Sequence, residues 1–230
     1  MREFIAGSAT FGVVLSLVCY YLGVLLKKKF NSPIMNPLLI GIVLTIIFLL
    51  VFKVDYEDYN SSAKYLSWLL TPATVSLAIP LYMELDRLRK NFKAIILSIF
   101  VGTVISLAVI LVFALIFGFS HSQYVTFLPK SITTAIGMSI SEELGGIKAI
   151  TVAAIIVTGI LGNIIGESVL KLCRVTDPIA KGLAMGTSAH AIGTAKAMEM
   201  GEVEGAMSSL SIVTAGIITV ILANVFAMFI

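Results

Sequence analysis

Runs of apolar residues as long as a lipid bilayer is thick recur along this chain. Crossing the hydrocarbon core of a bilayer takes about 20 apolar residues in an α-helix. Hydrophobic residues make up 58% of the chain, and its mean hydropathy of +1.03 lies outside the range of soluble domains. We therefore predict an all-α polytopic membrane protein with about six spanning helices. The predicted spanning runs are 4–26, 33–52, 66–83, 95–119, 149–170 and 205–230.

Three clusters of basic residues between these runs predict how the helices are oriented. The clusters lie at 27–29, 87–93 and 171–181. Loops rich in Lys and Arg stay on the cytoplasmic side of a membrane, so we place all three there. The connections 53–64 and 118–127 carry no basic excess and are placed outside. The net charge of +3 thus sits in loops, and it predicts orientation in a membrane rather than binding to nucleic acid.

This orientation constrains two segments between the long runs. The run 149–170 ends at a cytoplasmic cluster, so segment 128–146 has to begin and end on the outer side. By the same reasoning, segment 178–202 enters and leaves from the cytoplasm. We predict that both are re-entrant hairpins or broken helices, inverted relative to each other, which is a recurring device in transporters. If these segments cross the membrane fully instead, the last basic cluster lies outside.

The same two segments repeat each other in sequence, 56 residues apart. Both TTAIGMSISEELGG (133–146) and AHAIGTAKAMEMGE (189–202) combine Gly with small polar residues, and both precede an apolar run containing Ile-Val-Thr. Gly breaks a membrane helix only where the freed backbone groups face protein or water, and unpaired N–H groups attract anions. We therefore predict a polar site inside the membrane. Close helix packing is the alternative explanation for the small residues.

Hydroxyl and imidazole groups beside these glycines are the candidate donors to a carboxylate. Ionisable groups at membrane depth are costly and usually functional, so acidic residues nearby are candidates for carrying a coupled proton or ion. The predicted substrate-binding residues are Ser131, Thr133, Thr134, Gly137, Thr187, Ser188, His190, Gly193 and Thr194. The predicted coupling residues are Glu143, Glu199, Asn163 and Glu167, with His190 as a further proton carrier.

Some of these residues also have a purely structural explanation. Glu167 lies four residues before Lys171 and can reach the cytoplasmic face along the helix. A single buried histidine is often a core residue, although the small polar neighbours of His190 favour a role in a site. Asp177 followed by Pro178 is typical of the start of a helix.

The chain contains no sequence motif of a metal, nucleotide or common catalytic site. HExxH, CxxC, a Walker loop and GxGxxG are absent, and Cys19 and Cys173 lack partners at metal-ligand spacing. We expect no cofactor, no metal and no enzymatic activity. Without an ATP-binding element, any transport must be driven by gradients of ions or substrate. A membrane-embedded hydrolase using Ser131 or Ser188 is an alternative, but no nucleophile-elbow pattern surrounds either serine.

One stretch resembles a known family. DPIAKGLAMGTSAHAIGTAKAMEMGEVEGAMSSL (177–210) closely resembles the signature of the LrgB/CidB membrane family. TPATVSLAIPLY (71–82) and LPKSITTAIGMSISEELGG (128–146) are similar to the same family in order and spacing. The resemblance extends over roughly residues 1–230, and Ala191 stands where the family often has Gly after the histidine.

We accordingly expect one LrgB-like membrane domain over 1–230. Its first part, 1–119, is a scaffold of helices, and the segments 128–170 and 178–230 form the inverted pair that makes the site.

The resemblance implies two different functions. One is an antiholin-like protein that modulates murein hydrolase export and cell death together with a small LrgA/CidA partner. The other is a carboxylate carrier, because bacterial members are linked to pyruvate transport and plastid relatives exchange glycolate and glycerate. The duplicated polar segments favour the carrier, since a lesion formed by oligomerisation needs no such site. We expect a homodimeric secondary transporter of small monocarboxylates (pyruvate, lactate, glycolate) in the bacterial cytoplasmic membrane.

Overall fold

The computed structural model describes residues 8, 10–30, 35–69, 72, 75–76 and 78–230, and all regular secondary structure in these residues is α-helical. The predicted all-α class is thus confirmed. Contacts divide the chain into two compact units, Met1–Ser76 and Leu77–Ile230, which are described separately. The expectation of one domain over 1–230 stays a prediction.

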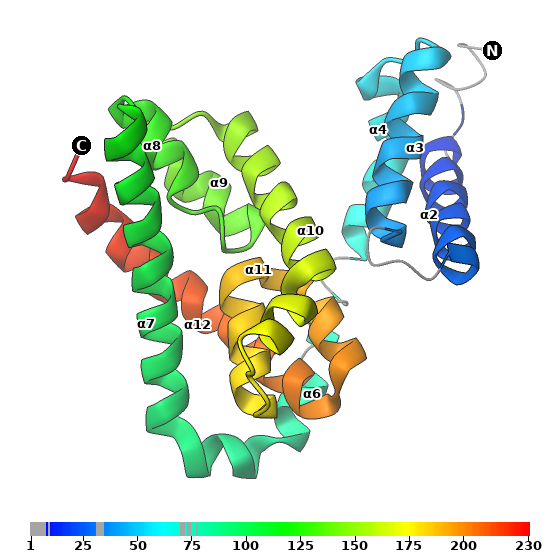
Figure 1. Ribbon diagram of the computed structural model, residues 1–230. Helices are drawn as coiled ribbons and strands as arrows, with labels where there is room; N and C mark the ends of the chain where they lie inside the picture. Colours follow the sequence, from blue (N-terminus) through cyan, green and yellow to red (C-terminus); the bar gives the residue numbers. More distant parts are fainter. Residues whose placement is uncertain (1–7, 9, 31–34, 70–71, 73–74, 77) are drawn as a thin grey trace. The chain divides into compact units, whose positions relative to one another are not determined.

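The first unit consists of α2 (Phe11–Phe30), α3 (Pro37–Val51) and α4 (Tyr56–Trp68) (Figure 1). Asn36 starts α3, because its side chain accepts hydrogen bonds from Leu38 N at 2.8 Å and Leu39 N at 3.1 Å. Gly12 brings α2 against α4, where its N–H donates to Ser62 Oγ at 2.7 Å. A side chain at Gly12 would collide with the α4 backbone, so these helices meet at a position that only Gly fits.

Two predicted boundaries in this region differ from the structure. The expected connection 53–64 is largely helical, because α4 begins at Tyr56 with Glu57 and Asp58 in its first turn, a favourable start for a helix. The expected run 66–83 is not one continuous helix: α4 ends at Trp68, and α6 covers Ala78–Met83. Parts of this run, like the first residues of the run 4–26, lie outside the described residues.

The second unit contains the remaining helices. They are α6 (Ala78–Met83), α7 (Leu85–Phe117), α8 (His121–Phe127), α9 (Thr134–Glu143), α10 (Lys148–Leu172), α11 (Pro178–Met200) and α12 (Glu202–Ala227). Among the described residues of the whole chain, four helices are long and apolar enough to cross a membrane, namely α2, α7, α10 and α12. The protein is therefore a polytopic membrane protein.

Segment 121–143 is a helical hairpin. The short helices α8 and α9 are joined by a non-helical stretch, 128–133. The start of α8 lies beside the end of α9, because His121 Nε2 is 3.2 Å from Leu144 O and Ser122 Oγ donates to Gly145 O at 2.9 Å. The stretch 128–133 is thus the tip of a hairpin whose two ends lie together (Figure 1).

Helix α11 is also folded back on itself. Ala189 (φ −131°, ψ 16°) and His190 (φ 43°, ψ −138°) have non-helical backbone angles. Met185 and Ala197, on either side of the break, share one packed cluster with Leu170. In a straight helix these twelve residues would separate them by about 18 Å, so the two arms must lie side by side.

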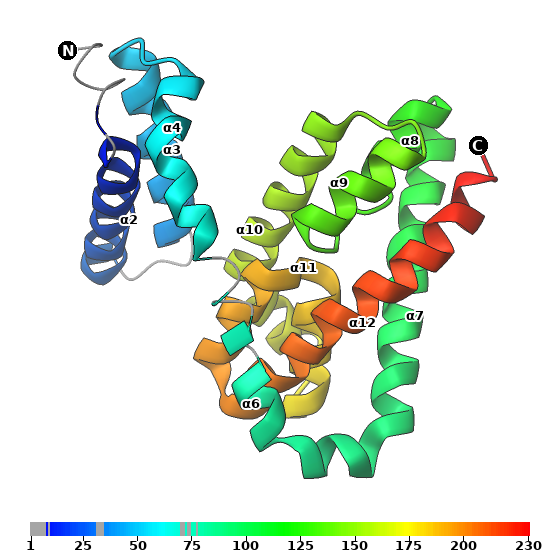
Figure 2. The same cartoon turned by 180° about the vertical axis from the view of Figure 1, so that it is seen from behind.

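The two hairpins are inserted from opposite ends of this unit. Figures 1 and 2 show the α8–α9 hairpin beside the end of α7 and both ends of α11 at the other end, near α6. Helix α10 leads from one hairpin to the other, and α12 returns. At the start of α11, Asp177 accepts a hydrogen bond from Ala180 N at 2.8 Å with Pro178 at the first helical position, which confirms the predicted helix start.

Small residues allow close packing around α11. A Cβ added at Gly186 would lie 2.4 Å from the carbonyl oxygen of Ser208 on α12, and one at Gly193 would lie 2.6 Å from the carbonyl oxygen of Met185. Gly137 packs in the same way against the side chain of Ile155 on α10. Close packing therefore accounts for these three glycines individually, and a site must be sought in the polar side chains beside them.

Candidate functional site

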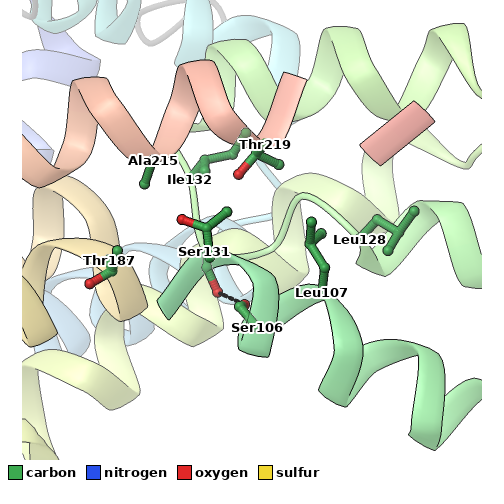
Figure 3. A pocket seen from close by; sticks show the side chains of 9 residues that line it. Ser106, Leu107, Leu128, Ser131, Ile132, Thr187, Ala215 and Thr219 are labelled. Carbon is green, nitrogen blue, oxygen red and sulfur yellow. Dashed lines mark hydrogen bonds between the residues drawn. The ribbon is translucent and has the colours of Figure 1, made fainter. Parts of the chain in front are cut away.

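A small buried cavity joins the two hairpins. It lies between α7, the tip of the α8–α9 hairpin, the first arm of α11 and α12 (Figure 3). Its volume of about 10 Å³ matches a single water molecule. Its hydroxyl groups come from Thr103, Ser106, Ser131, Thr187 and Thr219, and its apolar lining from Leu107, Leu128, Ile132 and Ala215.

A larger groove of about 360 Å³ adjoins this cavity and shares Ser106, Ser131 and Thr187 with it. The volume lies within the range of small-molecule sites, about 300–1,000 Å³. The groove adds two further polar groups, the ammonium group of Lys130 and the hydroxyl of Ser188. Its apolar lining consists of Gly102, Ile105, Val109 and Ala184.

The hairpin tip carries the polar groups that the cavity and the groove share. Ser131 is buried, and its Oγ lies 3.0 Å from Ser106 Oγ on α7, as Figure 3 shows. Lys130 Nζ donates to the same oxygen at 3.0 Å. Helix α9 begins just beyond, and the side chain of its N-cap residue Thr133 accepts no hydrogen bond from the described N–H groups of this turn. The start of α9 thus brings partial positive charge to the tip.

His190 fixes the break in α11 against α10. The buried imidazole donates from Nε2 to the carbonyl of Ile155 at 3.0 Å, and it packs against Gly159. The His190 carbonyl accepts from Thr194 Oγ1 at 3.0 Å, and that hydroxyl lies 2.7 Å from Ser208 Oγ on α12. The described linings of the cavity and the groove do not include His190 or Thr194. These residues therefore stabilise the break in α11 without lining either space.

Both hairpins meet α10 at the same residue, Ile155. Its side chain packs against Gly137 of the first hairpin, and its carbonyl accepts the hydrogen bond from His190 of the second. One residue of α10 therefore contacts both of the repeated segments.

The structure places the predicted coupling carboxylates at helix ends. Glu143 is exposed at the end of α9, and Glu199 is exposed near the end of α11, where it pairs with Lys196 at 3.3 Å. Glu167 pairs with Lys171 at 2.8 Å and with Lys196 at 3.0 Å. These contacts tie the end of α10 to the second arm of α11.

The end of α10 also lines a hollow of about 660 Å³ in volume. Glu167, Glu199 and the buried Glu204 face basic residues there, including Arg174 and Lys181. Asn163, one turn before Glu167, donates to the Ile192 carbonyl at 2.8 Å and supports the backbone just after the break.

The structure brings only part of the predicted binding set together. Ser131 and Thr187 line the cavity, Ser188 lines the groove, and Thr133 and Thr134 are half-buried at the hairpin tip. The described residues contain no group of three or more His, Cys, Asp or Glu side chains placed to hold a metal ion.

Sequence reasoning missed Lys130 and the hydroxyls of α7. Lys130 stands beside the predicted binding residue Ser131, but a single lysine outside the three basic clusters gives no sequence signal of a site. Thr103 and Ser106 are three residues apart in a mostly apolar run, so their hydroxyls lie on one face of the helix. That pairing is the signal that would have identified them.

Comparisons with a family model and with individual proteins identify the same family. Residues 16–229 match the model of the LrgB-like family. The chain is 42% identical over 221 residues to proteins named antiholin-like protein LrgB from Bacillus mycoides (strain KBAB4), Bacillus cereus (strain B4264) and Bacillus anthracis (strain CDC 684 / NRRL 3495), which covers 96% of each chain. No solved structure shows a significant match. The resemblance expected from the sequence is confirmed: this chain belongs to the LrgB-like family.

Proposed function

We propose that this protein is a secondary transporter of small monocarboxylates, of the pyruvate, lactate and glycolate class, in the bacterial cytoplasmic membrane. One observation carries this proposal: hydroxyls from both broken segments, Ser131 and Thr187, line the same buried cavity. Polar groups at membrane depth are costly and mark sites. Discontinuous helices that meet between inverted repeats are the usual location of a substrate site in secondary transporters.

In this proposal the α8–α9 hairpin and α11 are re-entrant segments that enter from opposite sides of the membrane. The cytoplasmic side is the one where Lys171 and Arg174 lie, by the positive-inside rule. Helix α9 and the second arm of α11 both begin at the breaks. Two helix N-termini would then direct positive potential toward a bound anion.

The proposed binding residues divide by role. Ser131, Thr187 and Ser188 donate hydroxyl hydrogen bonds to the carboxylate, and Thr133 and Thr134 contribute at the start of α9. Gly137 and Gly193 allow the tight packing at the breaks, while His190 and Thr194 hold the second break in place. The chain is proposed to act as a homodimer.

The cavity is too small for a three-carbon acid, so substrate has to enter through the adjoining groove. Binding would then separate α7 from the hairpin tip, where Ser106 and Ser131 are hydrogen-bonded. Opening on one side and closing on the other is the alternating access expected of a secondary transporter.

Coupling to a proton or ion is proposed to use Glu143, Glu199, Asn163, Glu167 or His190. Three of these, Glu199, Glu167 and Asn163, lie along the second arm of α11 or on the part of α10 that supports it. A change of charge there would alter how firmly this arm is held to α10, which is a direct way to link protonation to movement of the arm.

Flux measurements in proteoliposomes test the transport proposal. We expect the double variant Ser131→Ala, Thr187→Ala to reduce uptake of labelled pyruvate by about 100-fold or more, because each of the two hydrogen bonds to the charged carboxylate contributes about 1.5–3 kcal/mol. The matched control is Ser168→Ala, an exposed hydroxyl on α10. Wild-type flux in the double variant would refute the proposed site, and no flux of any two- to four-carbon acid by the wild type would refute the transporter.

A second candidate function is an antiholin-like regulator of murein hydrolase export and cell lysis that acts with an LrgA/CidA-type partner. The names of the Bacillus relatives support this function more directly than they support a carrier. A regulator of this kind depends on surfaces that face a partner, so it should tolerate the loss of Ser131 and Thr187. Control of lysis that survives the double variant while pyruvate flux is absent would favour it.

A further inference from the structure

We propose that Lys130 supplies the positive charge that binds the carboxylate of the substrate, and that its single charge restricts the site to monoanions. This inference deepens the proposed transport function and rests on it. It concerns a residue at the tip of the first hairpin, where the chain is neither α8 nor α9.

The position of Lys130 fits a binding group. Its side chain is half-buried and lines the groove of about 360 Å³, and its Nζ donates to Ser131 Oγ at 3.0 Å. Through that oxygen it is connected to Ser106 and to the small cavity. The ammonium group therefore stands where the groove meets the cavity between the two hairpins.

The charge of Lys130 has no acidic counterpart in the described part of the chain. Three other lysines of this unit pair with carboxylates: Lys148 with Glu142 at 2.5 Å, and Lys171 and Lys196 with Glu167. Around Lys130, the groove lining of the described residues includes no Asp or Glu. A charge at membrane depth is costly without a counter-ion, and a bound anion would provide one.

The other lining residues match a short acid. Ser188 and Thr187 bring hydroxyls from the first arm of α11 to the same groove. They donate to the carbonyls of Ala184 and Leu183 in the structure, so both would have to rotate for a carboxylate to accept hydrogen bonds from both hairpins. Ile105, Val109 and Ala184 supply an apolar surface for a short carbon chain. One cation neutralises one carboxylate, whereas a dicarboxylate would leave a second negative charge in surroundings of low polarity.

Binding of labelled pyruvate to the purified protein in detergent, without added lipid, tests this role. We expect Lys130→Gln to weaken binding by about 10- to 100-fold, the range for losing a hydrogen bond to a charged group, and Lys130→Arg to retain most of it. Lys148→Gln, which removes an exposed lysine outside the groove, is the matched control. Pyruvate binding by Lys130→Gln within twofold of wild type would overturn the assignment.

Substrate analogues give a second measurement that needs no variant. The wild type should bind lactate at least tenfold more tightly than uncharged lactamide, and lactate more tightly than the dicarboxylate malate. Equal binding of lactate and lactamide would overturn the role of Lys130 even if Lys130→Gln fails to fold. Displacement of pyruvate by an anionic phospholipid but not by lactate would show that Lys130 binds a lipid headgroup instead of the substrate.

Failure of this inference differs from failure of the transport function. Transport that is lost in Ser131→Ala, Thr187→Ala but normal in Lys130→Gln would leave the carrier standing and remove Lys130 from the site. Tight, charge-dependent pyruvate binding without flux in proteoliposomes would keep the binding site and refute the carrier.

Discussion

At the scale of single residues, polar side chains from both hairpins line the cavity and the adjoining groove. The predicted residues Ser131, Thr187 and Ser188 line the cavity or the groove, although Thr187 and Ser188 also donate to carbonyls of their own helix, those of Leu183 and Ala184. Lys130 escaped prediction, because a lysine between apolar runs is usually a marker of the membrane surface. Only the folding of its hairpin back into the unit shows that it lies beside α7 and α11.

Gly186 allows a test of close packing at one residue. A Cβ there would lie 2.4 Å from the backbone oxygen of Ser208, and overpacking costs about 1–3 kcal/mol, more than the roughly 1 kcal/mol that Ala gains over Gly in a helix. We expect Gly186→Ala to lower the thermal unfolding midpoint in detergent. In the control Gly102→Ala the new Cβ meets Thr187 at 3.6 Å, an ordinary contact, and the midpoint should not fall. A midpoint for Gly186→Ala at or above wild type would contradict the packing.

At the scale of helices, the two hairpins were located by two independent sequence signals, the basic clusters and the internal repeat. Each signal reports a property of a whole segment: its side of the membrane and its duplication. Helix ends were less predictable, as α4 shows, because hydropathy averages over many residues and does not register the acidic helix start at Glu57 and Asp58. The same averaging of hydropathy hid the interruption of the run 66–83.

The first hairpin is held by a group of buried hydroxyls that spans three helices. Thr151 Oγ1 on α10 lies 2.9 Å from Thr126 O on α8 and 2.6 Å from Ser141 Oγ on α9. Thr126 Oγ1 in turn accepts from Ile147 N at 2.8 Å, just before α10. The hydroxyl group of Thr151 therefore joins the two arms of the hairpin to the helix that follows.

Replacing this hydroxyl should loosen the hairpin. Thr151→Val keeps the shape of the side chain but leaves buried polar atoms without their partner, which costs about 1–3 kcal/mol of unfolding free energy. The measurement is thermal unfolding of the purified protein, with Ser139→Ala as the control, because that hydroxyl is exposed and bonds within its own helix. Equal stability of Thr151→Val and Ser139→Ala would show that the hydroxyl group does not hold the hairpin.

At the scale of the whole molecule, the two hairpins predict that their open ends face opposite sides of the membrane. Cys173 is exposed between α10 and α11, while Cys19 is buried. A membrane-impermeant maleimide should therefore label Cys173 in inverted vesicles and not in intact spheroplasts. In a Cys173→Ser background, Glu142→Cys at the end of α9 should show the reverse. Labelling of both positions from one side would contradict the inverted arrangement.

The cavity of about 10 Å³ has a consequence for the cell. In the proposed carrier this cavity lies on the substrate path, and a space that holds a single water molecule gives hydrated ions no continuous path across the bilayer. Many copies could therefore sit in a respiring membrane without draining its electrical potential. Dye-based recordings of that potential in cells that overproduce the protein should match those of cells that lack it.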